Sequence, residues 1–407
     1  MRSLTRAGAA VWLAVVLHLY GVRPASAQGR PASPFSVAGG RVLFAGDLSI
    51  TVGAPDPGWF TYTDYETSSL RRVRAGLAVE ARITSDLSAL FEARGETGRG
   101  VEPYAWYLRY RPWKGLVNLQ AGRIPPVFGA YARRSYPQNN PLIGDPLLYQ
   151  YLTALRPDAV PATVDDLLAM RARGWLVRYP VGDAEWRNGV PPIAASRWGT
   201  GVQALVAGQR LEGAVSVTLG SLSRPLARGP IRAPQVAGRV SWKPVVGLVV
   251  GISGSRSEFL DRDLIEILPA LVRDHPYRQR AVGFDGECSW GYWLVRGEFV
   301  ASGWSVPDLE APPIRGPLRA RGGYIEARRR VGPRLYVAAR ADRLAFSTVE
   351  GSRGSRTWDA DVSRLELGAG TTLRRGLLLK GSYLYHQRGG GRVREDHLWA
   401  AQLLWWF

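Results

Sequence analysis

Charged side chains alternate with apolar ones along many segments of this 407-residue chain. In residues 71–83, Arg74, Glu80 and Arg82 fall on one face of an extended segment, and apolar side chains fill the other face. Rings of charge that face an aqueous lumen select ions by short-range electrostatics. The pattern therefore predicts side chains that select ions and does not indicate a catalytic reaction.

The candidates for contacting a solute are charged residues on the faces that this alternation turns inward. Arg133 and Arg134, at the mouth of the longest connection, are the favoured pair. The strand candidates are Arg74, Arg109, Arg296, Arg340, Glu298 and Asp342. Each inward charge has an alternative role as a structural ion pair between neighbouring strands. Because inward acids nearly balance inward bases, we expect only weak selectivity.

Residues that carry catalysis or bind metals are scarce. After residue 27 the histidines are His275, His386 and His397, and none has a metal-ligand spacing such as His-x-x-x-His. His386 falls on an inward face, away from the lipid that a membrane lipase would attack. The single cysteine, Cys288, cannot form an internal disulfide. We expect no enzymatic activity, no cofactor and no metal.

The formal net charge of the chain is +19, and nearly all of its basic residues are arginine. A strongly basic chain can bind nucleic acid, but the export signal described next argues against that partner. The expected partners are outer-membrane lipid and lipopolysaccharide, together with small hydrophilic or anionic solutes.

The N-terminus has the features of a secretory signal peptide. Arg2 and Arg6 precede an apolar run over residues 7–20, and a small-residue cleavage site ends at Ala27. No later segment approaches the roughly 18 apolar residues of a membrane-spanning helix. The expected organisation is a signal peptide over residues 1–27, a periplasmic segment over 28–39 and a barrel over 40–407.

Strand-length segments with a period of two follow from residue 40 to the end. An even number of such segments, joined by alternating short and long connections, is typical of a bacterial transmembrane antiparallel β-barrel. About sixteen strands are expected, with both termini at the end that has the short turns. They are residues 41–52, 71–83, 87–96, 103–111, 116–124, 199–208, 211–220, 235–243, 247–255, 281–290, 292–302, 321–330, 334–343, 363–373, 377–386 and 397–407.

Residues 125–198 form a connection much longer than is usual between strands. Because it contains apolar stretches, we expect this third external loop to fold into the lumen and narrow it; an external cap or an extra hairpin is the alternative. Thr163, followed by Asp165 and Asp166, predicts a short helix over residues 164–170. A second short helix is expected over residues 257–268.

The last residues form one apolar face of a strand. Trp399, Leu403, Trp405 and Phe407 all fall on it, and aromatic side chains at a strand end suit a membrane interface. This ending resembles the closing strand of bacterial outer-membrane barrels, whose terminal phenylalanine is read by the barrel-assembly machinery. The resemblance implies that machinery as a partner.

Several segments resemble the phosphate-selective porin O and P family. Residues 119–129, Leu-Gln-Ala-Gly-Arg-Ile-Pro-Pro-Val-Phe-Gly, are similar to the family's Gly-Gln-x-x-x-Pro-Phe-Gly pattern, with Arg123 where glutamine is usual. Residues 294–299 and 323–340 are similar to later strands of the family. The resemblance implies an outer-membrane channel, and a homotrimer is expected from it. The family's ladder of arginines and its loop lysines cannot be assigned to particular residues of this chain.

Two functions follow as hypotheses. The first is a porin-like channel for passive diffusion of small hydrophilic solutes, with a weak preference for anions. The second is a structural or adhesive outer-membrane barrel whose lumen is plugged and whose external loops do the work.

Overall fold

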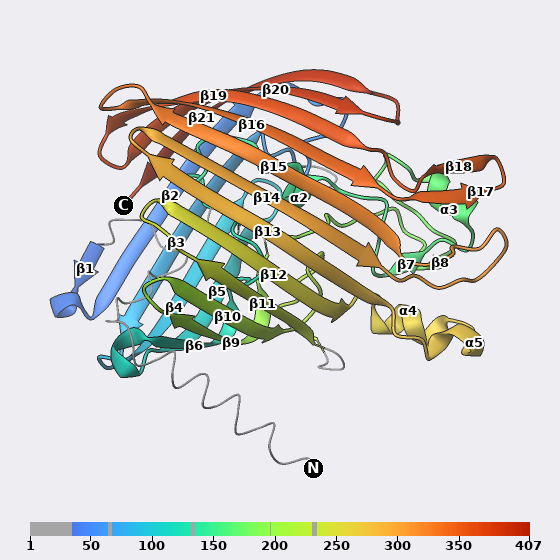
Figure 1. Ribbon diagram of the computed structural model, residues 1–407, viewed down its shortest axis with the longest axis horizontal. Helices are drawn as coiled ribbons and strands as arrows, with labels where there is room; N and C mark the ends of the chain where they lie inside the picture. Colours follow the sequence, from blue (N-terminus) through green and yellow to red (C-terminus); the bar gives the residue numbers. More distant parts are fainter. Residues whose placement is uncertain (1–34, 64–66, 132–134, 196, 230–233) are drawn as a thin grey trace, which may run out of the picture.

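The structure is a computed structural model that describes residues 35–63, 67–131, 135–195, 197–229 and 234–407. In this part of the chain the dominant feature is a closed antiparallel β-barrel of sixteen strands (Figure 1). The expected signal peptide lies outside the described residues. The predicted fold class and strand number are confirmed.

The barrel strands differ from the expected ranges by a few residues at their ends. They are β2 Val42–Gly53, β3 Arg72–Arg82, β4 Leu87–Glu96, β5 Gly100–Tyr110, β6 Val117–Ile124, β9 Gly199–Ala207, β10 Leu211–Thr218, β11 Gln235–Trp242, β12 Leu248–Glu258, β13 Arg278–Trp290, β14 Trp293–Trp304, β15 Leu318–Arg330, β16 Leu335–Phe346, β19 Val362–Arg374, β20 Leu377–Arg388 and β21 Glu395–Trp406.

Short elements lie outside the barrel wall. Strand β1 (Phe35–Val37) pairs with the start of β2 and is followed by a 3-10 turn, η1 (Ala38–Gly40). Two small two-stranded antiparallel sheets are formed by β7 (Ala159–Val160) with β8 (Val181–Gly182) and by β17 (Thr348–Gly351) with β18 (Gly354–Thr357). A second 3-10 turn, η2 (Trp113–Gly115), joins β5 to β6.

The last strand closes the barrel against the first. Strand β21 pairs with β2 from Asp47 opposite Trp406 to Gly53 opposite Ala400. The side chains of Trp399, Leu403 and Trp405 point outward and are 59%, 41% and 42% exposed. The ring of Phe407 lies against Gly46 of β2, where any larger side chain would meet it. The predicted outward apolar face therefore forms at the seam of the barrel.

The two ends of the barrel differ in their connections. Tight turns lie at the end where the chain terminates, and most connections at the opposite end are long (Figure 1). The exception at this opposite end is the connection between β4 and β5, which is a tight turn over residues 97–99.

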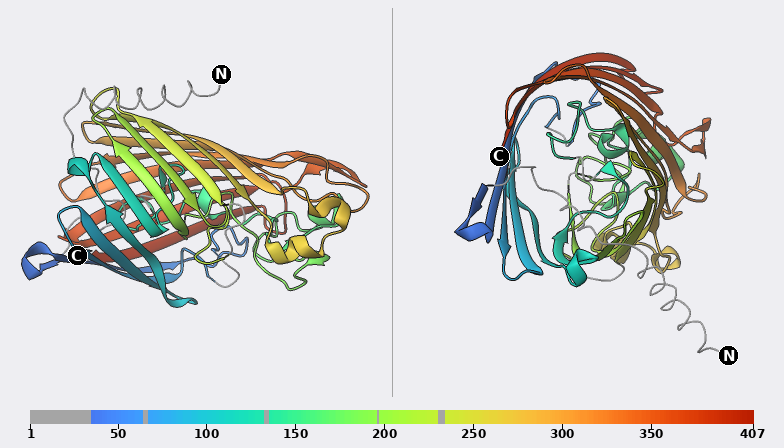
Figure 2. Two further views of the ribbon diagram at one scale, coloured as in Figure 1. Left: turned by 90° about the horizontal axis from the view of Figure 1, so that it is seen from below. Right: turned by 60° about the vertical axis from the view of Figure 1, so that its left-hand side comes forward.

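Much of the described part of residues 125–198 lies inside the barrel, as the end-on view shows (Figure 2, right), and its strands β7 and β8 lie near the end with the long connections (Figure 1). Apolar side chains of this segment join wall residues such as Val300, Leu318 and Leu344 in one buried cluster. We call this segment the inward loop. It contains helix α2 (Leu147–Gln150) and helix α3 (Val164–Ala169).

Helix α3 begins as the sequence predicts. The hydroxyl of Thr163 accepts a hydrogen bond from the Asp166 backbone, and the Asp166 carboxylate accepts one from the Thr163 backbone. The second expected helix was placed too early, because β12 extends to Glu258. The chain instead forms α4 (Arg262–Ile267) and, after Pro269, α5 (Ala270–Arg273). Across the described residues, no helix has the length and apolar character to cross a membrane.

Candidate pore and constriction site

Acidic side chains of the wall hold the backbone of the inward loop. The carboxylate of Glu366 on β19 accepts hydrogen bonds from the backbone N–H groups of Ile143 and Gly144, at 3.2 and 3.0 Å. Asp342 on β16 accepts one from Leu147 at 3.1 Å. Hydrogen bonds from backbone N–H groups to a carboxylate are stronger than those between neutral groups, because the acceptor is charged. These contacts satisfy polar groups of an irregular segment inside the barrel.

Two tyrosines of the inward loop bind acids on other parts of the wall. Tyr149 donates its hydroxyl to Glu298 on β14 at 2.6 Å, and Tyr136 donates to Glu92 on β4 at 2.7 Å. Burial raises the pKa of Tyr136 well above its ordinary value, and the adjacent Glu92 carboxylate adds to the effect. Tyr136 therefore stays protonated and acts as a donor.

Basic side chains of the wall hold carbonyl groups of the same loop. The ammonium group of Lys380 on β20 donates to the carbonyls of Pro137, Asn140 and Leu142 at 2.9, 3.1 and 3.1 Å. Arg340 on β16 donates to the carbonyl of Gly144 at 2.6 Å. The loop is thus fixed to wall strands on several sides of the barrel.

Many inward charges also form ion pairs across neighbouring strands. Arg340 contacts Glu326 at 3.3 Å, Asp342 at 3.3 Å and Glu366 at 2.5 Å. Glu326 and Glu366 lie on β15 and β19, the two strands that flank β16, and Asp342 lies on β16 itself. Three carboxylates therefore surround the arginine. These charges therefore have the role that the sequence offered as the alternative, that of structural ion pairs between strands.

The structure separates the predicted candidates into groups. Arg340, Glu298 and Asp342 are buried beneath the inward loop, with 1%, 4% and 5% of their surface exposed. Arg109 on β5 is buried and forms an ion pair with Glu80 on β3, on the far side of the intervening strand β4. Arg296 is paired with Glu287 at 2.9 Å and Glu326 at 3.7 Å. Of the strand candidates, Arg74 alone lines the cavity described next.

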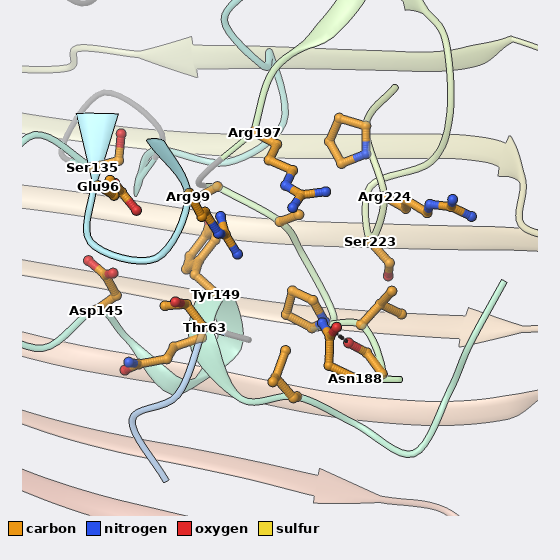
Figure 3. A pocket seen from close by; sticks show the side chains of 18 of the residues that line it. Thr63, Glu96, Arg99, Ser135, Asp145, Tyr149, Asn188, Arg197, Ser223 and Arg224 are labelled. Atoms are coloured by element: carbon orange, nitrogen blue, oxygen red, sulfur yellow. Dashed lines mark hydrogen bonds between the residues drawn. The ribbon is translucent and has the colours of Figure 1, made fainter. Parts of the chain in front are cut away.

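An open cavity of about 260 Å³ lies between the inward loop and the wall strands β3 and β4. Arginines from several segments line it, and Figure 3 shows Arg99, Arg197 and Arg224 among its side chains. The lining arginines are Arg72, Arg74, Arg94, Arg99, Arg187, Arg197 and Arg224, and the lining acids are Glu96, Asp145 and Asp158. We call this the arginine cavity.

The wall side of the cavity is partly neutralised. Arg72 lies 3.6 Å from Glu96, and Arg74 lies 3.9 Å from Asp47 and 4.0 Å from Glu96. Such separations are long for a direct ion pair. The Nε and Nη2 atoms of Arg74 are buried and have no hydrogen-bond partner. The charge of Arg74 is therefore only partly balanced by the two acids.

The other side of the cavity carries Arg187, Arg197 and Arg224, of which Arg187 pairs with Asp183 and Arg224 with Asp261. Desolvation by its surroundings lowers the pKa of Arg197, and the nearby guanidinium of Arg99 lowers it further. The lowered pKa therefore arises first from desolvation and second from repulsion by Arg99. An anion in the cavity would relieve that repulsion.

The favoured candidates Arg133 and Arg134 lie outside the described residues. Ser135, which follows them in the sequence, lines the cavity and accepts a hydrogen bond from Arg74 at 3.1 Å through its carbonyl. Arg99, Arg187 and Arg197 were missed by the sequence analysis, because they lie in connections without a period-two pattern. Among the described residues, no group of three or more His, Cys, Asp or Glu side chains is arranged to hold a metal ion.

Comparison with known proteins supports the fold. No family model and no curated protein matches the sequence. A Salmonella typhi OmpF structure in complex with daunomycin aligns with a TM-score of 0.57 and 11% identity, covering 90% of this chain and 97% of that chain. OmpT, an outer membrane protein of Vibrio cholerae, aligns with a TM-score of 0.52 and 10% identity over 90% and 97% of the two chains. The chain therefore has the porin-like barrel fold of outer-membrane proteins.

Proposed function

We propose that this protein is an outer-membrane channel for passive diffusion of small hydrophilic solutes, with a weak preference for anions. The observation that carries the proposal is the arginine cavity, an open space between the inward loop and the wall. Its lining combines several arginines with fewer acids.

The physical basis is electrostatic focusing. Charges of one sign along a narrow, low-dielectric passage raise the local concentration of the opposite ion. Two charges 4 Å apart interact by about 4 kcal/mol at an effective dielectric constant near 20. Ion pairs along the rest of the wall, such as Arg239 with Asp285, cancel much of the remaining field. The expected preference is therefore modest and decreases as salt screens it.

A structural or adhesive barrel with a plugged lumen is the second candidate function. The observation that favours it is the extent of the inward loop, which hydrogen-bonds to strands β4, β12, β14, β16, β19 and β20. In that case the external loops would contact partners and the cavity would be a blind vestibule.

Conductance in planar lipid bilayers distinguishes the two functions. Reproducible single-channel steps would support the channel, and silence from folded, heat-modifiable barrel would favour the plugged form. Reversal potentials across a KCl gradient then test the site. Arg99→Gln with Arg197→Gln should lower the anion-to-cation ratio. The matched control, Arg319→Gln with Arg321→Gln, changes two arginines that point away from the lumen and should leave the ratio unchanged.

The location and assembly belong to the same proposal. We infer export by the signal peptide of residues 1–27, a periplasmic position for residues 28–39, and insertion by the barrel-assembly machinery. A homotrimer is proposed as well; a trimer form is described for OmpT of Vibrio cholerae. Relationship to the phosphate-selective porin O and P family stays a prediction from residues 119–129. The expectation of no enzymatic activity and no nucleic-acid partner also stays a prediction.

A further inference from the structure

Five arginines form a patch on the outer surface of the barrel, near the end with the long connections. All five are exposed, and the residue next to each in sequence points into the barrel. They lie on β12, β13, β15 and β16 and are Arg256, Arg280, Arg319, Arg321 and Arg343. We call them the outer arginine patch.

Strand register brings these cations close together. Arg256 lies directly opposite Arg280 on the neighbouring strand. Gly303 lies between Arg280 and Arg319, and Ala301 lies beside Arg321. Like charges directly opposite in an antiparallel pair are destabilising. None of the five forms an ion pair with an Asp or Glu of the described chain. The five guanidinium groups therefore have no ion-paired carboxylate, and Asp308 is the acid that lines the groove described next.

The surface between the arginines is a groove rather than a flat wall. This open groove has a volume of about 830 Å³, and Arg280, Arg319 and Arg321 line it together with the small residues Ala301 and Gly303 and the acid Asp308. Arg256 and Arg343 lie outside its lining. The absence of large side chains at the last two positions leaves room between the guanidinium groups. A compact anionic group can enter there and reach more than one arginine.

An apolar band adjoins the patch on the same outward face. It consists of side chains between 48% and 59% exposed, which are Ile252, Val282, Phe284, Phe299 and Ile325. Such a band suits contact with acyl chains. A ligand for this surface would thus have a charged head and an apolar tail.

The patch is confined to one side of the barrel. Outside β12–β16, outward positions near the same end include the apolar residues Val73, Val101, Val217 and Val236, and Val236 on β11 lies directly opposite Arg256. A general attraction to an anionic membrane would require no such asymmetry. Concentration of the arginines over β12–β16 points to a localised site.

We propose that the outer arginine patch binds the phosphate groups of an anionic lipid in the outward-facing leaflet, with its acyl chains against the apolar band. Guanidinium groups bind phosphate through paired hydrogen bonds and are more weakly hydrated than ammonium groups. A phosphate in the groove is within reach of Arg280, Arg319 and Arg321, and its charge also offsets the repulsion between Arg280 and Arg256 on the neighbouring strand. The inference rests on the proposed outer-membrane location but not on conduction.

Native mass spectrometry of the full-length barrel in a neutral detergent tests the site, with diphosphorylated lipid A as the probe. The variant replaces four patch residues by glutamine: Arg256, Arg280, Arg319 and Arg321. We expect its lipid affinity to fall by about a hundredfold or more, because each basic residue near an anionic surface contributes a factor of about five. The matched control replaces four exposed arginines at the opposite end, Arg330, Arg334, Arg374 and Arg375, and should bind like the parent.

Three results would overturn the proposal. They are parental affinity in the patch variant, equal binding of lipid A stripped of its phosphates, and displacement of the lipid by millimolar inorganic phosphate, which would indicate a site for free anions. Heat-modifiable mobility confirms that each variant is folded. Conductance of the same variants separates the two proposals. A patch variant that loses lipid binding but keeps its channel steps supports the lipid site and leaves the channel proposal unaffected. A parent protein that binds the lipid at the patch but shows no channel steps contradicts the channel proposal alone.

Discussion

The hydroxyl of Tyr149 lies 2.6 Å from a carboxylate oxygen of Glu298, and this contact ties the middle of the inward loop to strand β14. Glu298 also accepts hydrogen bonds from the backbone of Ala130 at 3.3 Å and from the hydroxyl of Tyr324 at 3.4 Å. One buried carboxylate therefore joins two points of the loop to the wall. Its burial makes each donor important, because an unsatisfied carboxylate is costly.

Replacement of Tyr149 by phenylalanine should loosen the loop. Loss of one hydrogen bond to a buried charge costs about 1–3 kcal/mol, so we expect a lower thermal midpoint in detergent and noisier single-channel current. Tyr324→Phe is the matched control, because its contact with the same carboxylate is longer, and its effect should be smaller. Equal effects of the two substitutions would show that the Tyr149 contact does not hold the loop.

Lys380 should hold residues 137–142 in place, because its ammonium group donates hydrogen bonds to three carbonyls of that segment. Lys380→Met preserves much of the side-chain volume but removes all three donors. We expect faster proteolysis within the inward loop, measured by mass spectrometry of the fragments. Lys243→Met, at a lysine paired with Glu212 away from the loop, is the control and should leave the cleavage rate near that of the parent.

Arg133 and Arg134 carry the charge prediction made from sequence. If they stand at the constriction, their joint replacement by glutamate should shift selectivity toward cations, because a low-dielectric neck magnifies their field. Reversal potentials across a KCl gradient measure the shift. An unchanged anion-to-cation ratio would place both arginines outside the conduction path.

Asp359 predicts a pH dependence of stability. Its carboxylate accepts backbone hydrogen bonds from Ala154, Ala172 and Ala360, joining the inward loop to the connection before β19. Burial nonetheless raises its pKa from 3.8 to about 6. A raised pKa means that the folded state binds the proton more tightly, so this contribution is present in full below pH 3.8 and is lost as pH rises through about 6.

Between pH 4.5 and 7.5 the expected size of the Asp359 effect is about 2 kcal/mol, since one unit of pKa corresponds to about 1.4 kcal/mol. Thermal midpoints in detergent at pH 4.5 and 7.5 should therefore differ more for the parent than for Asp359→Asn, whose side chain does not titrate. The same pH dependence in both proteins would assign the effect to other groups.

The terminal aromatic residues should be required for assembly. Removing Phe407, or replacing Trp405 and Phe407 by serine, should sharply reduce the heat-modifiable barrel recovered in the outer membrane. The ring of Phe407 lies against Gly46 at the closing seam, and Trp405 packs beside it with ring centroids 5.2 Å apart. Normal barrel levels in these variants would contradict a role for the C-terminus in insertion.

The amino-acid sequence determined the features that depend on local pattern. Alternation with a period of two located the strands, because successive side chains of a strand point to opposite faces whatever the rest of the chain does. Thr163 and Asp166 located the start of helix α3, because capping is completed within one turn. The end of β12 was misplaced, since Ser257 and Glu258 continue the strand pairing with β13 and only that pairing reveals it.

The tertiary structure decided which charges pair and which remain for a solute. Arg340 is enclosed because strand register brings Glu326 and Glu366 to its two sides and the inward loop brings the Gly144 carbonyl. Arg99 and Arg197 share one cavity although they come from different connections. Neither outcome follows from periodicity, because it depends on the register between strands and on the path of a loop without repeating pattern. The physical reason is range: alternation is a property of neighbouring residues, whereas the field in a pore is the sum over groups that only folding brings together.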